Sequence, residues 1–319
     1  MSGKIRFAPS PTGYLHEGHL LSALYVWAAA AKWDLKIHLR IEDHDRSRAR
    51  EEYITGIKED LDWFGFRYDS ESIQRDHEEA YQAALKKLEA AHLVYPCYCS
   101  RKQLEAENPK SETGEIIYQG KCRGQFTIQN SKFKIETAGC SQFTIQNSQF
   151  KISAAGSNIS DIITPHNLRF KVTDKVIHWD DLRLGAFDEN PKLQCGDFPI
   201  RDRDGQWTYQ FAVCVDDINE GITHIVRGED IRNSTARQIM LMQTLGRDVP
   251  PLYLHHPLIS DSSGKKLSKR ELAHSLRQDR AAGATPEELL GRVCYKAGFA
   301  SDASPLPLKQ ALSLIQKKL

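Results

Sequence analysis

The fold is decided by the stretch Ile5-Arg6-Phe7-Ala8-Pro9-Ser10-Pro11-Thr12-Gly13-Tyr14-Leu15-His16-Glu17-Gly18-His19. Its apolar start predicts a short buried strand, which two prolines and a glycine then end. The alanine-rich run that follows, from Leu20 to Ala31, favours a helix. Where a strand enters a helix through a tight polar turn, backbone N–H groups and the helix dipole both favour an anion. The stretch therefore predicts an α/β protein with an anion site at this turn.

Length and composition are those of an ordinary globular protein. The chain has 319 residues, 40% hydrophobic and 27% charged, which suits about two domains. With a net charge of +1, nucleic-acid contact would need a local basic surface. Seven cysteines do not form the disulfide framework of a secreted protein. We expect a cytoplasmic protein with no signal peptide and no membrane contact, because the first strand starts at once and the longest apolar run is too short to span a bilayer.

Further strands and helices follow the opening stretch. Residues 36–41 alternate as a strand that ends in Glu42, at the sheet edge where ligands bind in open α/β folds. Residues 51–64 and 77–91 show helical periodicity. Hairpins are predicted over residues 167–180 and 197–213. Strands are predicted over residues 224–230 and 251–256, and a helix opens at Pro286.

A tandem copy interrupts the chain. Residues 125–135 and 142–152 are two eleven-residue segments that differ at one position. A solenoid needs about three units, so the pair indicates an inserted segment rather than a repeat fold. Its alternating pattern could form a hairpin, and we expect it to have no chemical role.

Four motifs in order resemble those of the class I aminoacyl-tRNA synthetases in their glutamyl form. They are the opening stretch from Arg6 to His19, the segment from Arg40 to Asp45, the segment from Val226 to Asp230, and Lys266-Leu267-Ser268-Lys269-Arg270. The resemblance implies a Rossmann-like parallel sheet that carries an inserted zinc-bearing α+β subdomain. The expected division is 1–95 for the first half of the catalytic domain, 96–196 for the insert with the repeat at 125–160, 197–260 for the second half, and 261–319 for the lysine signature and a C-terminal helical segment.

Two further features narrow the resemblance to the truncated glutamyl-queuosine paralogues. Only 49 residues follow Arg270, too few for the anticodon-binding domain of a full glutamyl-tRNA synthetase, and the chain carries a Cys-x-Cys pair at Cys97 and Cys99. The resemblance implies a monomeric ligase that activates L-glutamate with ATP and transfers it to queuosine in the anticodon of tRNA(Asp). Two alternatives stay open: a truncated enzyme that charges tRNA(Glu), and a catalytically idle RNA-binding paralogue.

The nucleotide side of the implied site contains histidines and lysines. Adenylation builds charge on phosphoryl oxygens, so it needs donors in place rather than a covalent nucleophile. His16 and His19 suit that task, although they could merely cap the helix. Lys266 and Lys269 are assigned to ATP, with Lys269 catalytic beside the two histidines, although short lysine clusters are usually solvated surface. Mg²⁺ is implied by the nucleotide alone.

The amino-acid side is assigned by the same resemblance. Arg6 and Arg227 suit a substrate with two carboxylates, since a guanidinium holds a carboxylate by parallel hydrogen bonds. An isolated arginine is more often part of a surface ion pair, and the sequence does not decide which arginine takes which carboxylate. Glu42 would neutralise the substrate ammonium and Tyr209 would add a hydroxyl. The segment Phe7, Ala8, Pro9 and Ser10 completes the glutamate pocket.

One structural zinc per chain is expected in the insert. Cys97, Cys99 and Cys122 are three soft ligands, and zinc prefers four ligands in a tetrahedron. Tyr118 is the proposed fourth ligand, an uncommon one, and Cys140 in the repeat is a rival. The alternative is a set of buried thiols without metal.

Overall fold

The computed structural model describes residues 3–123, 126–129, 132–135, 166–259 and 274–319. Lys266, Lys269, Cys140 and most of the tandem repeat lie outside these residues. Within them, none of the helices combines the length and the apolar character that crossing a bilayer requires.

The opening stretch folds as predicted. Strand β1, Lys4–Phe7, buries Ile5 and Phe7, and helix α1, Glu17–Trp33, begins after His16 as its N-cap. The helix extends the predicted run at both ends and stops at Asp34, whose φ of 52° is left-handed. Because α1 is buried on almost every side, the neighbouring helices and strands pack around it.

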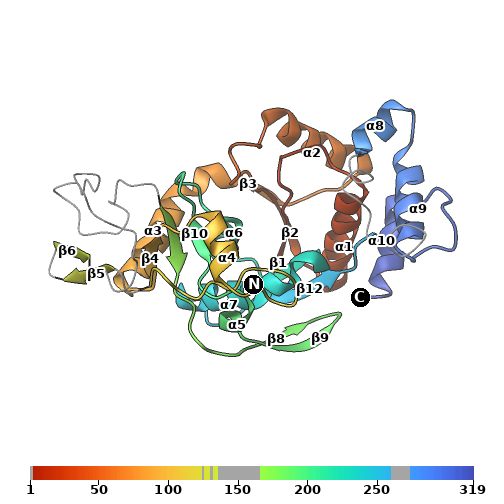
Figure 1. Ribbon diagram of the computed structural model, residues 1–319. Coiled ribbons are helices and arrows are strands. Elements are labelled where there is room, and N and C mark those ends of the chain that lie inside the picture. Colours follow the sequence, from red (N-terminus) through yellow and green to blue (C-terminus); the bar gives the residue numbers. More distant parts are fainter. Residues whose placement is uncertain (1–2, 124–125, 130–131, 136–165, 260–273) are drawn as a thin grey trace.

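A seven-stranded sheet forms the centre of the molecule (Figure 1). Its order is β3-β2-β1-β11-β12-β8-β9; every pair is parallel except β8 with β9. The order turns back between β1 and β11, the place where open α/β sheets bind ligands. The remaining bounds are β2 Lys36–Ile41, β3 Ser70–Ile73, β8 Ile177–Asp181, β9 Gly185–Glu189, β11 His224–Gly228 and β12 Leu252–His256. This is the parallel α/β sheet that the sequence predicts.

Helices cover both faces of this sheet. Val226 and Leu254 pack into the cluster with α1, α2, α9 and α10, whereas Ile225 and Tyr253 pack into the cluster with α3, α6 and α7. Successive strand residues therefore point to opposite faces, as a pleated strand requires. The bounds are α2 Glu51–Phe64, α3 Glu78–Ala90 after the 3₁₀ turn Gln74–His77, α6 Tyr209–Asn219, α7 Thr235–Thr244 after the 3₁₀ turn Glu229–Ser234, α8 Leu276–Ala281, α9 Pro286–Lys296 and α10 Leu308–Gln316. In Figure 1 the C-terminal helices stand at one end of the molecule.

A smaller sheet stands at the other end (Figure 1). Its strands β4 Val94–Cys97, β7 Asn167–Phe170 and β10 Pro199–Arg201 are antiparallel, in the order β10-β7-β4. Two short helices, α4 and α5, span Arg101–Glu107 and Pro191–Gln194. Strands β5, Phe126–Gln129, and β6, Lys132–Ile135, form the hairpin that the first repeat copy predicts.

The predicted hairpin over residues 167–180 is wrong, and the one over residues 197–213 is confirmed only around its turn, where Arg201 pairs antiparallel with Trp207. Strand β7 pairs with β4 and β10, whereas β8 joins the large sheet, so residues 167–180 do not pair with each other. Tyr209 begins helix α6 rather than a second strand after β10. We keep 96–196 as a proposed span for the insert, although β10 lies beyond it and β8 and β9 within it join the large sheet.

Candidate functional site

A cavity of about 1070 Å³ opens at the carboxyl edge of β1, β2 and β11. It lies where the strand order turns back, and the N-terminus of α1 forms part of its wall. The sequence-predicted residues that line it are Arg6, Phe7, Ala8, Pro9, Ser10, His16, His19, Glu42, Tyr209 and Arg227. The structure therefore brings together both histidines and every residue that the sequence analysis assigns to glutamate binding. Lys266 and Lys269 lie outside the described residues.

The two histidines are neutral, and each uses Nδ1 within the helix cap, which leaves its Nε2 available. His16 Nδ1 accepts from the backbone N–H of Gly18 at 3.1 Å, and His19 Nδ1 accepts from the backbone N–H of His16 at 3.2 Å. Both protons must then reside on Nε2, since a neutral imidazole carries one. Burial lowers the pKa of His16, and burial with the neighbouring His16 lowers the pKa of His19 to about 3. The pair thus caps α1 and also offers two uncharged N–H donors.

Arg6 and Glu42 belong to a buried ion network behind the cavity wall. Arg6 donates through Nε to Asp217 at 3.1 Å, and Arg40 donates to Asp217 at 2.8 Å and to Glu42 at 3.1 Å. Glu220 is a further acceptor for Arg40, at 2.8 Å. Burial raises the pKa of Glu42, and the charge of Arg40 opposes that shift. The network fixes both side chains at the cavity while it leaves most N–H groups of Arg6 available.

Arg227 is buried without a carboxylate partner among the described residues. Its guanidinium donates to His255 at 2.9 Å, to Gln238 at 2.6 Å and to Thr235 at 2.8 Å, and it is only 5% exposed. A buried charge without a counter-ion is unfavourable unless a ligand supplies one. The cavity wall at β11 is therefore suited to an anion.

Tyr209 lies at the first turn of α6 and is half-buried at the cavity. Burial raises its pKa, so its hydroxyl stays protonated and can donate a hydrogen bond. The carboxylate of Glu17, between the two histidines, binds Arg292 and Lys296, at 2.6 Å to each. These ion pairs connect α1 to α9.

Some lining residues are missed by the sequence. His44 and Asp230 line the cavity and lie inside the quoted motif segments, where their position after a strand was the available signal. Ser275, Arg277 and Gln278, at the start of α8, reach the cavity without any local signature. Asp217 is also missed, because it contacts Arg6 across 211 residues of chain.

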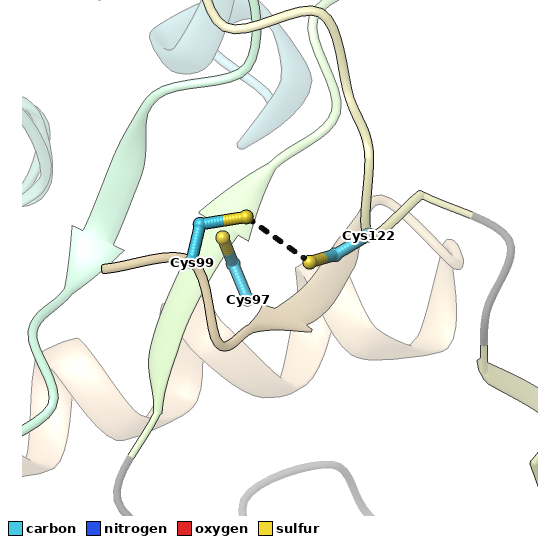
Figure 2. A group of neighbouring side chains, drawn as sticks. All are labelled: Cys97, Cys99 and Cys122. Carbon is cyan, nitrogen blue, oxygen red and sulfur yellow. Dashed lines mark hydrogen bonds between the residues drawn. The ribbon is translucent and has the colours of Figure 1, made fainter. Parts of the chain in front are cut away.

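Three cysteines of the insert gather at the end of β4, where Cys97, Cys99 and Cys122 point toward one another (Figure 2). Their sulfur atoms lie within 4.8 Å of one another, and Cys99 Sγ is 3.6 Å from Cys122 Sγ. Two thiolates on a tetrahedral zinc are about 3.8 Å apart, as Zn–S bonds of about 2.3 Å require. The buried cluster could therefore bind zinc.

Tyr118 stands beside this cluster. Its hydroxyl oxygen lies 3.5 Å from Cys97 Sγ and 3.6 Å from Cys99 Sγ, and it accepts from the backbone N–H of Cys122 at 2.9 Å. Burial raises the pKa of Tyr118, while hydrogen bonds with Cys122 and Cys99 lower the pKa of Cys97. Three thiols and a phenol oxygen thus meet at one point, a donor set that fits a soft divalent cation. The other described cysteines, Cys195, Cys214 and Cys294, are buried elsewhere.

The sequence offers only scattered basic residues for RNA contact, namely Arg67, Arg75, Arg101, Lys102, Lys121 and Arg123. All of these except Lys102 form ion pairs within the described residues. Arg75 pairs with Asp43 and Glu51, at 2.5 Å to each. Similar pairs hold Arg67, Arg101, Lys121 and Arg123. They therefore do not mark one basic surface.

Comparison with known proteins identifies one family, two relatives and one solved structure. Residues 4–305 match the family described as tRNA synthetases class I (E and Q), catalytic domain. The chain is 36% identical to a "Glutamyl-Q tRNA(Asp) synthetase" of Symbiobacterium thermophilum over 94% of this chain and 88% of that protein. It is also 36% identical to "Glutamate--tRNA ligase 2" of Acidiphilium cryptum, over 96% of this chain but 63% of that protein. The crystal structure of the glutamate-tRNA synthetase from Elizabethkingia anophelis has the same fold, with a TM-score of 0.71 at 24% identity over 99% of this chain and 66% of that one.

Proposed function

Since this chain belongs to the class I tRNA synthetases of the glutamate and glutamine group, we propose that it activates L-glutamate with ATP and transfers the glutamyl group to queuosine in the anticodon of tRNA(Asp). The chain spans 88% of the Symbiobacterium relative, whose name states that activity. The observation that carries the proposal is the buried guanidinium of Arg227, which lacks a carboxylate partner in the described residues and lines the same cavity as the two histidines.

Activation joins a carboxylate oxygen of glutamate to the α-phosphorus of ATP, and pyrophosphate leaves. Negative charge spreads over the phosphoryl oxygens during this step. His16 and His19 would donate their Nε2–H groups to those oxygens, and their low pKa values keep them neutral near pH 7. Because the donors are already held by backbone hydrogen bonds, they need no reorientation as the charge develops. Lys269, with Lys266, is proposed to contact the ATP phosphates.

Glutamate would be recognised by groups of both signs. Arg227 has two N–H groups beyond its three protein bonds, one on each Nη atom, and Arg6 has more than one. These donors suit the two carboxylates of glutamate. Glu42 would accept the ammonium group, and the protonated hydroxyl of Tyr209 would add one donor. The backbone from Phe7 to Ser10 would form the floor of this pocket.

Transfer follows activation. A hydroxyl of queuosine attacks the glutamyl carbonyl, the bond to the phosphate breaks, and AMP leaves. A single-stranded anticodon loop can splay its bases outward, which lets a nucleoside enter an enclosed site. We expect a cytoplasmic monomer as the acting form.

Two metals accompany this proposal. Cys97, Cys99, Cys122 and Tyr118 are proposed to hold one structural zinc per chain, which would fix the base of the small sheet. Tyr118 would serve as a phenolate, a form that the guanidinium of Arg169, 4.0 Å from its ring centroid, would favour. Mg²⁺ bound with ATP neutralises phosphate charge when present.

The test is a glutamate-transfer assay with three RNAs: tRNA(Asp) with queuosine, tRNA(Asp) without it, and tRNA(Glu). The proposal expects labelled glutamate on the first RNA only. Transfer to tRNA(Glu) would instead support the second candidate, a tRNA(Glu)-charging enzyme, which the Acidiphilium relative favours. If the folded protein shows no glutamate-dependent pyrophosphate exchange, an idle RNA-binding paralogue is the better account.

A further inference from the structure

The Nε–H of Arg227 donates to a histidine rather than to a carboxylate. The acceptor is Nε2 of His255, 2.9 Å away, on the neighbouring strand β12. An acceptor nitrogen must carry a lone pair, so the proton of His255 has to be on Nδ1. A protonated His255 would place two cations in contact, and burial lowers its pKa to about 4.

Asp181 fixes that tautomer. Its Oδ2 accepts from Nδ1 of His255 at 2.6 Å and from the backbone N–H of the same residue at 2.9 Å. Its Oδ1 accepts from the backbone N–H groups of Arg183 and Leu184, at 3.0 Å and 2.9 Å. Both side chains are fully buried. The carboxylate therefore cannot rotate without losing several hydrogen bonds.

We propose that Asp181 and His255 are positioning residues that hold Arg227 for a substrate carboxylate. The chain of hydrogen bonds runs from β8 through β12 to β11, three adjacent strands of the large sheet. In this chain His255 accepts from the Nε–H of Arg227, while Gln238 and Thr235 each accept from an N–H of one Nη atom. One N–H on each Nη atom is left for a bidentate contact with the amino acid. This inference rests on the proposed function, because the ligand it serves is glutamate.

Asp181→Asn should reverse the tautomer. The amide oxygen should replace Oδ1, which accepts two backbone N–H groups, because the opposite orientation would lose both of those bonds. The amide NH₂ then replaces Oδ2 and faces Nδ1 of His255, and only the bond from the backbone N–H of His255 is lost. The amide then donates to Nδ1, the ring proton moves to Nε2, and two donors meet at Arg227. We expect ¹⁵N spectra of histidine-labelled protein to show an Nδ1–H tautomer for His255 in the unaltered protein and an Nε2–H tautomer in Asp181→Asn. The signal is assigned by its absence from His255→Gln.

Kinetics separate positioning from a merely structural role. In ATP–pyrophosphate exchange, His255→Leu removes the acceptor, and KM for glutamate should rise about ten- to a hundredfold, the loss of one hydrogen bond to a charged group. His255→Gln, whose amide oxygen can accept from Arg227, should recover most of that loss. KM for ATP should not change in either variant, and circular dichroism verifies that both are folded.

Each result bears on a distinct claim. An Nε2–H tautomer in the unaltered protein, or equal glutamate KM values for the Leu and Gln variants, overturns the positioning role. Absence of glutamate-dependent exchange in the unaltered protein refutes the proposed function instead, and with it the substrate assigned here. If His255→Leu does not fold, Asp181→Asn provides the same KM comparison.

Discussion

Glu42 and Glu220 both bind Arg40, yet their replacement by glutamine should have opposite consequences. Glu220 has a pKa of about 2, against an unfolded value of 4.5, so its charge contributes about 3 kcal/mol to stability at pH 7. That contribution is present above pH 4.5 and is lost as the pH falls toward 2. Burial raises the pKa of Glu42, so its charge is not stabilising. Glu220→Gln should therefore lower the free energy of unfolding by about 3 kcal/mol, and Glu42→Gln should not lower it.

Binding should show the reverse pattern. Glu42 lines the cavity and is proposed to accept the substrate ammonium, whereas Glu220 does not line it. Losing one charged hydrogen bond of about 1.5–3 kcal/mol should raise KM for glutamate about ten- to a hundredfold in Glu42→Gln and leave it unchanged in Glu220→Gln. Urea unfolding measures the first quantity and pyrophosphate exchange the second. The reasoning is wrong if Glu220→Gln raises KM as much as Glu42→Gln, or if Glu42→Gln loses as much stability as Glu220→Gln.

Three other predictions concern pH, metal and the lysine signature. His255 and His256 have pKa values of about 4 in the folded protein, so on acidification the unfolded chain binds their protons before the folded protein does. The free energy of unfolding should therefore fall as the pH drops from about 6.5 to 4, by up to about 3 kcal/mol for each histidine. Urea titrations measure this, and a flat profile would contradict it. Metal analysis should find about one zinc per chain, lost in Cys99→Ser but kept in the buried control Cys294→Ser; full metal in Cys99→Ser would exclude Cys99 as a ligand. Lys269→Ala should lower pyrophosphate exchange steeply while its circular dichroism spectrum stays native, and an unchanged rate would remove Lys269 from the site.

Local sequence patterns predict those helices and strands that have one buried face and one exposed face. Helix α2 spans the predicted residues 51–64, and Gly65 ends it with a φ of 82°. Helix α6 replaces the strand that the pattern predicts up to Val213, because all residues from Phe211 to Asp217 are buried and no exposed polar face reveals the helical period. The wrong hairpin at 167–180 has a related cause: alternation identifies a strand but not its partner, and β7 and β8 join different sheets.

Some residues of the candidate site could be predicted from local sequence, and others could not. Residues at the carboxyl end of a strand within a motif, such as Arg227 near the end of β11 and Glu42 just after β2, could be assigned from the sequence and the resemblance. Asp217, Asp181 and His255 could not, because each acts by touching a residue far away in the chain; Asp181 lies 74 residues from His255. Their roles arise from strand order, which brings β8, β12 and β11 together only in the folded protein.

The pairing of β1 with β11 has a consequence for biosynthesis. Ile5 lies opposite His224 in the sheet, so the inner edge of β1 stays unpaired until that part of the chain has been made. At about 5–20 residues per second, the ribosome needs roughly 10 to 40 seconds for this. During that time β1 and β2 present an open sheet edge and an apolar α1, the kind of surface that chaperones bind and that aggregates when left uncovered. The cavity at the edge of β1 and β11, which needs both strands, can form only late in synthesis.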